Sequence, residues 1–342
     1  MIPKLGAAIL GTGDVSGQHI RGYQANPYVE VRAILSRDLA RAAAKAAEYR
    51  LPNCRPYTDL EALLRAEDID IVSICTPHHL HVGQGVACAQ AGKHVIVEKP
   101  VALDLPGLRR LASAVRDHNV RSVVGFVLRW NPLFETIRAI LAGGLLGKLF
   151  YGEVDYLHGI TGSLALFPWV SRRAYGGSAL LTAGCHAVDS LRWFLQSEAV
   201  EVFSYSNFSP ANPLGYEYEP NSVTLIRFQS GAMGKVATSI EYVAPYTFPI
   251  SLMGDRGTLR DNRLFTKDWP GQTGWAVIPT VLPDSGSVTH HPFTAQIAHF
   301  IDCIRNGVES HCNLADAVKT HEICLAAEMS HRQGMPVRLP LP

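Results

Sequence analysis

A glycine-rich turn near the start of the chain has the residue types that bind phosphate through the backbone. Gly11 and Gly13 follow the apolar stretch 7–10, and Ser16 occupies the sixth position of a G-x-G-x-x-G/A pattern. Such a turn lets the backbone approach a pyrophosphate, and the next helix directs N–H groups at it. An unliganded turn is the simpler alternative, but its place between a strand and a helix favours nucleotide binding. The residues expected to contact the nucleotide here are Gly11, Thr12, Gly13, Asp14 and Val15.

The end of the second apolar strand, at Leu35, bears on which dinucleotide fits. NAD-binding sites place an acidic residue there for the ribose diol. This chain has Ser36 at that position and Arg37 next to it, and a guanidinium suits a 2′-phosphate. The pattern therefore favours NADP over NAD as the cofactor. Asp38 is either the ribose-binding acid displaced by two positions or the N-cap of the helix that follows.

Two polar segments follow the apolar runs 69–75 and 94–97: Thr-Pro-His-His-Leu-His at 76–81 and Glu-Lys-Pro at 98–100. Ligands of an open parallel sheet bind at the carboxyl ends of its strands, so both segments are expected to border the cofactor. The three histidines could hold a metal ion, but no further ligand follows at a matching spacing, and no metal site is predicted. The residues expected to contact the cofactor here are Thr76, Pro77, His78, His81, Glu98 and Lys99.

Lys99 also has the chemistry of a catalytic group. It stands between Glu98 and Pro100 directly after a buried strand, which leaves it little freedom. As an ammonium it would stabilise negative charge that develops on a substrate oxygen. A surface lysine paired with Glu98 is the simpler alternative.

A third polar group lies in the segment 176–189, where Gly176-Gly177 leads into a helical pattern. Thr182, His186 and Asp189 stand at i, i+4 and i+7, which places a hydroxyl, an imidazole and a carboxylate along one helix face. A buried histidine is more often a satisfied core residue. The three groups together, in a stretch poor in charge, favour a substrate site.

Further substrate-site residues are expected in the second half of the chain. Arg129 could reach cofactor or substrate from the domain junction, or simply pair with an acid. His158 ends a strand pattern at 154–158 and could reach a sugar hydroxyl. Weaker candidates are Trp169, Tyr242, His290 and His291.

The elements that must position these groups fall into two patterns. Over residues 1–125, short β-branched runs at 7–10, 29–35, 69–75 and 94–97 alternate with alanine-rich helical stretches. This alternation predicts βαβ units and a doubly wound parallel sheet, an α/β nucleotide-binding domain.

Residues 126–342 instead contain strand patterns in pairs that are separated by short turns, as in β-hairpins. Strand patterns at 222–229 and 232–242 flank Ser230-Gly231, and those at 249–253 and 257–259 flank Asp255-Arg256. They predict an α+β domain with a large, mostly antiparallel open sheet. The segment 269–283 has three prolines and no charged residue and is expected to be an ordered loop. Helices at 293–305 and 314–333 close the chain and could pack back on the first domain.

Composition excludes several classes of protein. Of the 342 residues, 47% are hydrophobic and 18% charged, which predicts a folded core. Thirty-one Lys and Arg against 30 Asp and Glu leave a net charge of +1 without a basic stripe, which argues against nucleic acid or an anionic membrane as partner. The uncharged run 71–92 contains proline, histidines and glycines and does not read as a membrane span. Seven scattered cysteines without C-x-x-C, and no signal-peptide pattern at the N-terminus, favour a reduced, cytoplasmic compartment.

The sequence resembles the glucose–fructose oxidoreductase / inositol dehydrogenase (Gfo/Idh/MocA) family over nearly its whole length. The resemblance rests on G-T-G-D-V-S-G-Q-H at 11–19, T-P-H-H-L-H at 76–81, G-K-H-V-I-V-E-K-P at 92–100, G-F-V-L-R-W-N-P at 125–132 and G-G-x-x-L-L-x-x-G-C-H-x-x-D at 176–189. It implies a Rossmann domain joined to an α/β domain whose open sheet often forms oligomer interfaces, hence a homodimer or homotetramer.

The resemblance also implies an activity. Such enzymes transfer hydride between NAD(P) and a secondary hydroxyl or keto group of a sugar, polyol or cyclitol. Carried over by motif, Lys99 and His186 are the acid–base pair, and Asp189 is a substrate ligand. The Lys99–Pro100 bond is expected to be cis.

This chain departs from the family pattern at three positions. Thr182 stands where an aspartate often precedes the histidine by four residues, so Lys99 and His186 are expected to work without a carboxylate that orients the imidazole. His78 replaces an asparagine, and Ser178 replaces a third glycine. Two other functions stay open: a glycoside-cleaving enzyme that recycles a tightly bound NAD(H), and a non-catalytic nucleotide sensor. The presence of Lys99, His186 and Asp189 together argues against the sensor.

Overall fold

The computed structural model describes residues 4–283 and 291–342. The chain forms two compact units: unit 1 comprises residues 1–127 and 292–318, and unit 2 comprises residues 128–291 and 319–342. The second division falls inside the long helix α11 (Leu314–Gln333).

Unit 1 contains a six-stranded parallel sheet with the order β3-β2-β1-β4-β5-β6. Its strands are β1 (Leu5–Leu10), β2 (Val29–Leu35), β3 (Arg55–Tyr57), β4 (Ile71–Ile74), β5 (His94–Val97) and β6 (Ser122–Val124). The doubly wound parallel sheet is therefore confirmed. The four strand patterns recognised in the sequence correspond to β1, β2, β4 and β5. The other two have three residues each, too few to show a period.

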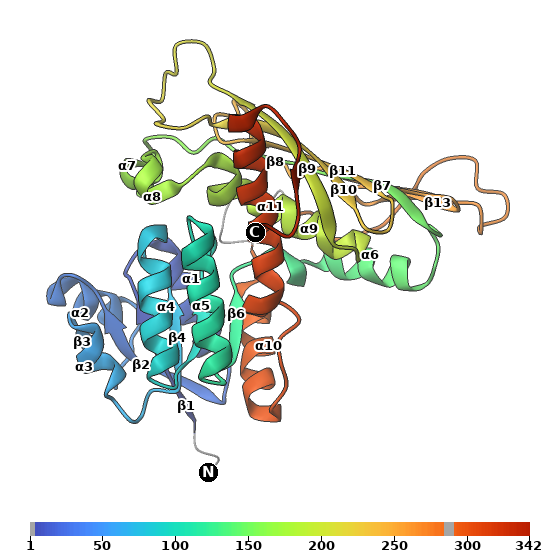
Figure 1. Ribbon diagram of the computed structural model, residues 1–342. Helices are drawn as coiled ribbons and strands as arrows, with labels where there is room; N and C mark the ends of the chain where they lie inside the picture. Colours follow the sequence, from blue (N-terminus) through green and yellow to red (C-terminus); the bar gives the residue numbers. More distant parts are fainter. Residues whose placement is uncertain (1–3, 284–290) are drawn as a thin grey trace. The chain divides into compact units, whose positions relative to one another are not determined.

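Helices cover both faces of this sheet, as Figure 1 shows. They are α1 (Asp14–Gln24), α2 (Leu39–Glu48), α3 (Leu60–Leu64), α4 (His81–Gln90) and α5 (Leu105–Asp117). Asp38, Asp59 and Asp104 cap α2, α3 and α5, because each carboxylate accepts a hydrogen bond from a backbone N–H in the first turn.

A segment far along the chain completes unit 1. Helix α10 (Phe293–Asn306) packs against α1, where Ile297 lies over Gly22. The Gln296 amide donates to the Val124 carbonyl at the end of β6, at 2.8 Å. The boundary of unit 1 therefore differs from a single cut at residue 125, since α10 belongs to this unit.

Unit 2 contains a ten-stranded sheet with the order β15-β14-β13-β12-β7-β11-β10-β9-β16, and β8 pairs with β11. Its strands are β7 (Leu149–Val154), β8 (Tyr156–Leu157), β9 (Ala199–Asn207), β10 (Asn221–Phe228), β11 (Met233–Ser239), β12 (Ile250–Gly254), β13 (Gly257–Arg260), β14 (Arg263–Thr266), β15 (Ala276–Val277) and β16 (Val337–Arg338). Apart from the parallel pairing of β11 with β7 and β8, the described pairs are antiparallel. The mostly antiparallel sheet is confirmed, and β15 lies in the segment expected to be a loop.

The helices of unit 2 lie on one face of its sheet (Figure 1). They are α6 (Pro132–Ala142), α7 (Phe167–Val170), α8 (Arg173–Gly176), the π-helical segment η3 (Leu180–Gly184), α9 (Cys185–Leu195) and the second part of α11. Leu191 of α9 lies over Gly152 of β7 and Gly234 of β11, where glycines allow close approach. Along β10, Thr224 and Ile226 are buried on this face, whereas Val223 and Leu225 are exposed on the other.

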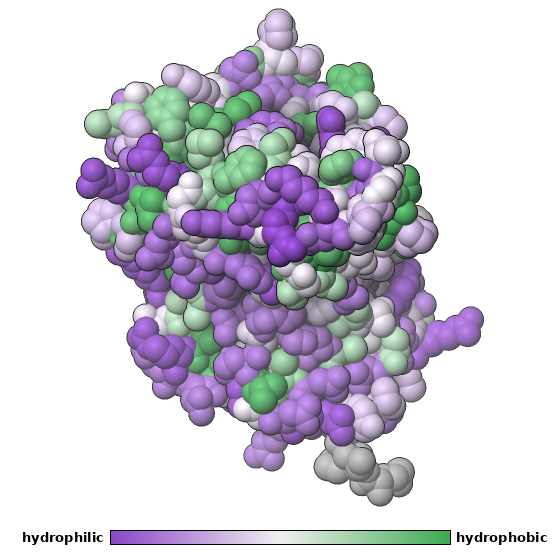
Figure 2. Space-filling view, turned by 90° about the vertical axis from the view of Figure 1, so that its right-hand side faces the viewer, coloured by the Kyte–Doolittle hydropathy of each residue, from purple (hydrophilic) through white to green (hydrophobic). Residues whose placement is uncertain are grey.

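The surface mixes residue types. Figure 2 shows hydrophobic residues interspersed with hydrophilic ones over the face that it views. Among the helices of the described residues, none has both the length and the apolar composition needed to cross a membrane.

Candidate functional site

The glycine-rich turn of unit 1 has the backbone geometry that the sequence predicts. Gly11 adopts a φ of 101°, and a Cβ there would collide with the Cys75 carbonyl at the end of β4. Gly13 is the N-cap of α1, and a Cβ on it would project into open space. Because a glycine cap has no side chain to cover the first N–H groups of the helix, this helix end fits a pyrophosphate.

The end of β2 distinguishes between the two roles considered for Asp38. Its carboxylate accepts a hydrogen bond from the Ala40 backbone N–H at 2.8 Å, so it caps α2. The Ser36 hydroxyl accepts from the Asp38 N–H at 3.4 Å and is nearly buried, whereas Arg37 is exposed. Arg37 is therefore the charged side chain here that can reach a ligand.

The two polar segments after β4 and β5 are joined by a buried histidine. His81 has none of its surface exposed, and its Nδ1 and Nε2 each lie 2.8 Å from a carbonyl oxygen, that of Pro100 and that of Thr76 respectively. This burial gives His81 a different role from the direct cofactor contact expected, because its ring nitrogens face the backbone. His78, in the 3₁₀ turn η1 (His78–Leu80), is also largely buried, whereas His79 is exposed.

The Glu98-Lys99-Pro100 segment has a cis Lys99–Pro100 peptide bond, as predicted. Glu98 is buried, and its Oε1 lies 2.9 Å from Nε2 of His19 on α1. The other ring nitrogen of His19 lies 3.1 Å from the Ser73 hydroxyl. Burial acts to raise the pKa of Glu98, but the hydrogen bond with His19 and the positive charge of Lys99 outweigh it and lower that pKa. Glu98 is thus a buried carboxylate held by α1 at the base of the segment that carries Lys99.

His186 lies in the first turn of α9 and is 5% exposed. The ring of Tyr156, from β8, is nearly parallel to the imidazole, with an interplanar angle of 13° and ring centroids 6.1 Å apart. His291 contacts the imidazole edge-on, with centroids 6.5 Å apart. An aromatic ring therefore lies along the imidazole and limits its rotation.

Thr182 lies differently from the expected single helical stripe. Residues 180–184 form a π-helix, whose wider turn breaks the i, i+4 spacing assumed from the sequence. The Thr182 hydroxyl donates to the Gly176 carbonyl at 2.7 Å and thereby ties η3 to the preceding glycine loop. This hydrogen bond holds the hydroxyl against the backbone of its own segment.

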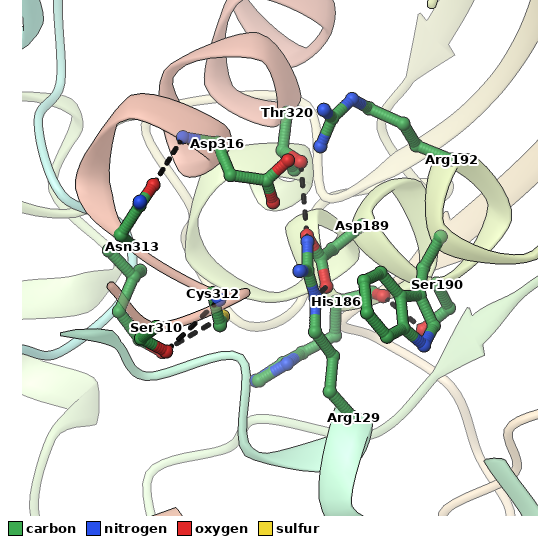
Figure 3. Close-up of polar contacts among 12 residues, drawn as sticks. Arg129, His186, Asp189, Ser190, Arg192, Ser310, Cys312, Asn313, Asp316 and Thr320 are labelled. Carbon is green, nitrogen blue, oxygen red and sulfur yellow. Dashed lines mark hydrogen bonds and ion pairs between the residues drawn. The ribbon is translucent and has the colours of Figure 1, made fainter. Parts of the chain in front are cut away.

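Asp189 and Arg129, both expected at the substrate, bind each other (Figure 3). Nε and one terminal nitrogen of Arg129 donate to the two Asp189 oxygens at 2.8 and 2.6 Å, and the Thr320 hydroxyl of α11 donates at 3.1 Å. The two charged side chains are 1% and 2% exposed. The guanidinium also stacks over Trp193, 4.4 Å from the ring centroid. The structure therefore corrects the expectation for Asp189: it holds Arg129 in the interior, and the simpler alternative for Arg129, a pair with an acid, is the one observed.

Aromatic side chains around His186 were missed by sequence reasoning. Tyr156 and Tyr246 are buried with ring centroids 5.2 Å apart, and His158 lies 5.1 Å from Tyr246. The Tyr156 hydroxyl lies 3.4 Å from Nδ1 of His158. The only sequence signal was the Tyr-Leu-His triplet at 156–158, since Tyr246 comes from a distant loop. Of the weaker candidates, Trp169 and Tyr242 are half-buried, and His290 lies outside the described residues.

Lys99 belongs to unit 1, and His186, Thr182, Asp189, Arg129 and His158 belong to unit 2. Among the described residues, no group of three His, Cys, Asp or Glu side chains is placed to hold a metal ion. Unit 1 thus carries a glycine-rich turn after β1 and a lysine after β5, two strands away in the same sheet, and unit 2 carries a histidine set among aromatic rings.

Two family models match the two halves of this arrangement. Residues 5–126 match an oxidoreductase family with an NAD-binding Rossmann fold, and residues 134–260 match the Gfo/Idh/MocA C-terminal domain. The chain belongs to the Gfo/Idh/MocA family of oxidoreductases.

Similar proteins of the Gfo/Idh/MocA family include sugar and cyclitol dehydrogenases. The chain is 28% identical over 293 residues to scyllo-inositol 2-dehydrogenase (NAD(+)) of Bacillus subtilis, and the matched region covers 83% of this chain and 80% of that protein. It is 27% identical over 352 residues to D-apiose dehydrogenase of Paraburkholderia graminis, which covers 99% and 90%. A solved structure of levoglucosan dehydrogenase with NADH and levoglucosan has the same fold, with a TM-score of 0.89, 22% identity, and coverage of 99% of this chain and 100% of that one.

Proposed function

We propose that this protein is an NAD(P)-dependent dehydrogenase or reductase that acts on a secondary hydroxyl or keto group of a sugar, polyol or cyclitol. The observation that carries the proposal is the pair of half-sites: a glycine-rich helix N-terminus after β1 with Lys99 after β5 of the same sheet in unit 1, and His186 among aromatic rings in unit 2. The names of the scyllo-inositol and D-apiose dehydrogenases support this substrate class.

The two catalytic residues have separate tasks in the proposed reaction. A bound nicotinamide would accept or donate the hydride. Lys99 and His186 act on the substrate oxygen, one as the group that takes up the hydroxyl proton and the other as a donor that stabilises negative charge on that oxygen. Glu98 and His81 keep the Lys99 segment in place, and Tyr156 keeps the His186 ring in its plane.

We propose the rings around His186 as the part of unit 2 that receives the substrate. Tyr156, Tyr246 and Phe248 supply flat apolar surface, and His158 supplies a polar edge. A sugar or cyclitol ring has both an apolar C–H face and hydroxyl edges, which matches such a lining. In this arrangement Asp189 and Arg129 support the helix that carries His186 instead of binding the substrate directly.

We propose NADP as the preferred cofactor, with NAD as the alternative. The hydrogen bond from the Ala40 N–H to the Asp38 carboxylate supports this preference, because it directs the acid considered for the ribose diol toward α2. Ser36 and Arg37 then form the contact with a 2′-phosphate. The names and descriptions of several relatives mention NAD(H), and binding measurements with both nucleotides test this preference.

We further propose a cytoplasmic homodimer or homotetramer built on the open face of the unit 2 sheet. On that face Tyr205 is 68% exposed, Leu225 54% and Met233 60%. These side chains lie on the adjacent strands β9, β10 and β11, and an exposed apolar face of this kind commonly marks an interface between protein chains. Sedimentation of the Leu225→Arg variant should show a smaller assembly than the unmodified protein.

The first experiment is to denature desalted, purified protein and to quantify any released nucleotide by chromatography. A protein without nucleotide is expected for a dehydrogenase that exchanges its cofactor at each turnover, and polyols and keto-sugars are then screened by absorbance at 340 nm. Stoichiometric nucleotide without net redox turnover would favour the glycoside-cleaving alternative. Failure to bind either NAD or NADP would overturn the proposed function.

A further inference from the structure

The strongest unexplained feature of unit 1 is the environment of His81. This residue opens α4, has no exposed surface, and lies between the two polar segments that follow β4 and β5. Its Nδ1 is 2.8 Å from the Pro100 carbonyl oxygen, and its Nε2 is 2.8 Å from the Thr76 carbonyl oxygen. Both partners are backbone carbonyls, which only accept hydrogen bonds.

Donor counting shows that only one charge state satisfies both contacts. A neutral imidazole has one N–H and one nitrogen lone pair, whereas an imidazolium has two N–H groups. In the neutral state one ring lone pair would face a carbonyl lone pair at 2.8 Å, which is repulsive, so that contact has to lengthen. The arrangement with both contacts short is therefore that of the imidazolium.

The two carbonyls belong to segments with different tasks. Thr76 follows β4 in the loop that leads to His78, and its hydroxyl donates to the Gln84 side chain at 2.6 Å. Pro100 directly follows Lys99. A ring that holds both carbonyls sets the position of the Lys99 segment relative to the loop after β4.

We propose that His81 is a proton-dependent positioning residue for Lys99: as an imidazolium it ties the Pro100 carbonyl to the Thr76 carbonyl, and as a neutral ring it releases one of them. The inference rests on the proposed function only for the catalytic task of Lys99. The bridge itself and its dependence on the proton follow from the geometry of unit 1.

The groups that surround His81 determine where its proton is lost. Glu98 and Lys99 act on it from the segment after β5, and the ring of His78 lies 5.7 Å away. Helix α4 carries no Asp, Glu, Lys or Arg, and the charged side chains of the neighbouring α5 are exposed.

These influences have opposite signs. Burial disfavours the charged ring and lowers the pKa of His81, and Lys99 acts in the same direction. The two carbonyls and Glu98 favour the charged ring, but they do not outweigh burial. The bridge should therefore be complete on the acid side of the ordinary histidine pKa of about 6.5 and open as the pH rises through the lowered value.

The direct test is nuclear magnetic resonance of the whole protein labelled with ¹⁵N in its histidines, from pH 5 to pH 8. The signals of His81 are identified by their absence in the His81→Gln variant. At the acid end both ring nitrogens should show imidazolium shifts, and they should convert to a single neutral tautomer with a midpoint below about 6.5. A His81 ring that keeps one charge state over the whole range overturns the proposal.

The second readout is the dissociation constant for NADH, followed by fluorescence over the same pH range. In the unmodified protein it should change by about fivefold or more with the midpoint found by resonance. His81→Gln should abolish this dependence. His118→Gln, in which an exposed histidine loses a contact with one carbonyl, that of Ala114, should retain it.

These measurements separate the two possible failures. If no sugar or polyol is oxidised but His81 titrates as described, the proposed function fails and the bridge stands. If the enzyme is active but the NADH constant of the unmodified protein does not follow the His81 midpoint, the positioning role is wrong. Should His81→Gln not fold, His81→Phe supplies the missing signal, and the titration of the unmodified protein still decides.

Discussion

The half-site of unit 1 and that of unit 2 are built in different ways. In unit 1 the groups proposed to face the cofactor come from short segments at the ends of β1, β2, β4 and β5, and the topology of a parallel sheet places those ends at one edge. In unit 2 the surroundings of His186 come from β8, from the loop that carries Tyr246, from α9 and from His291, which are distant in sequence. The first half-site is therefore readable from local motifs, whereas the second depends on which side chains the fold brings together.

The largest expected effect tests the claim that both half-sites contribute to one reaction. His186→Ala and Lys99→Ala should each lower kcat by about 10²–10⁴-fold, since each removes a group that moves a proton or stabilises charge in the transition state. The measurement is turnover of the first polyol or keto-sugar found active. The dissociation constant for the nucleotide should stay unchanged in His186→Ala, because that residue is in the other unit. Wild-type turnover in either variant would contradict the pairing of the two half-sites.

The second prediction concerns the buried pair in unit 2, which sequence reasoning assigned to substrate. Asp189→Asn leaves the Arg129 guanidinium buried without its carboxylate and should cost about 3–5 kcal/mol of unfolding free energy, measured by chemical denaturation. Arg65→Met is the control, because Arg65 and Glu61 form an exposed pair and its loss should leave the midpoint unchanged. Unchanged stability with a raised KM would return Asp189 to the substrate site.

A third prediction tests the interpretation of Arg37, just after β2, as a ligand of the 2′-phosphate of NADP. Arg37→Ala should raise the dissociation constant of NADPH by about tenfold and leave that of NADH almost unchanged, because the guanidinium would meet only a 2′-phosphate. Titration of both nucleotides by fluorescence measures the two constants. Equal changes for the two would show that Arg37 does not read the 2′-phosphate.

The smallest effect is expected at Thr182, where the sequence predicts α-helical spacing to His186 and the structure has a π-helix. Thr182→Val removes the hydrogen bond to the Gly176 carbonyl and should cost about 1 kcal/mol of unfolding free energy with turnover largely retained. Thermal and chemical denaturation together with kcat measure both quantities. A loss of turnover as large as that of His186→Ala would instead place the Thr182 hydroxyl in the proton path.

The predictions from the sequence that the structure confirms rest on short local patterns of apolar residues and turn residues. The strand pattern at 94–97 coincides with β5, because a strand buried on both faces needs nearly continuous apolar residues. The pattern at 29–35 coincides with β2, whose first half alternates buried valines with the partly exposed Glu30 and Arg32. Hairpin residues at 230–231 and 255–256 separate the observed pairs β10–β11 and β12–β13. Gly11 takes the left-handed backbone that the turn requires.

The predictions from the sequence were wrong or incomplete where a polar side chain could have more than one partner. Asp189 could bind substrate or a buried cation, and the sequence does not show that the guanidinium of Arg129, sixty positions away, reaches it. The spacing of Thr182 and His186 presupposed an α-helix, but residues 180–184 adopt a π-helix. His81 was expected to contact the cofactor, but its two ring nitrogens face backbone carbonyls that come from separate loops.

The sequence by itself determined the doubly wound sheet, the phosphate-binding turn and the lysine at the end of β5, because each depends on neighbouring residues and on the shared edge of parallel strands. Only the tertiary structure decided the partners of Asp189, the rings around His186 and the bridge made by His81. A buried polar or aromatic side chain contacts the groups that folding brings within a few ångströms of it. Those groups can lie anywhere along the sequence, so no local pattern predicts the contact.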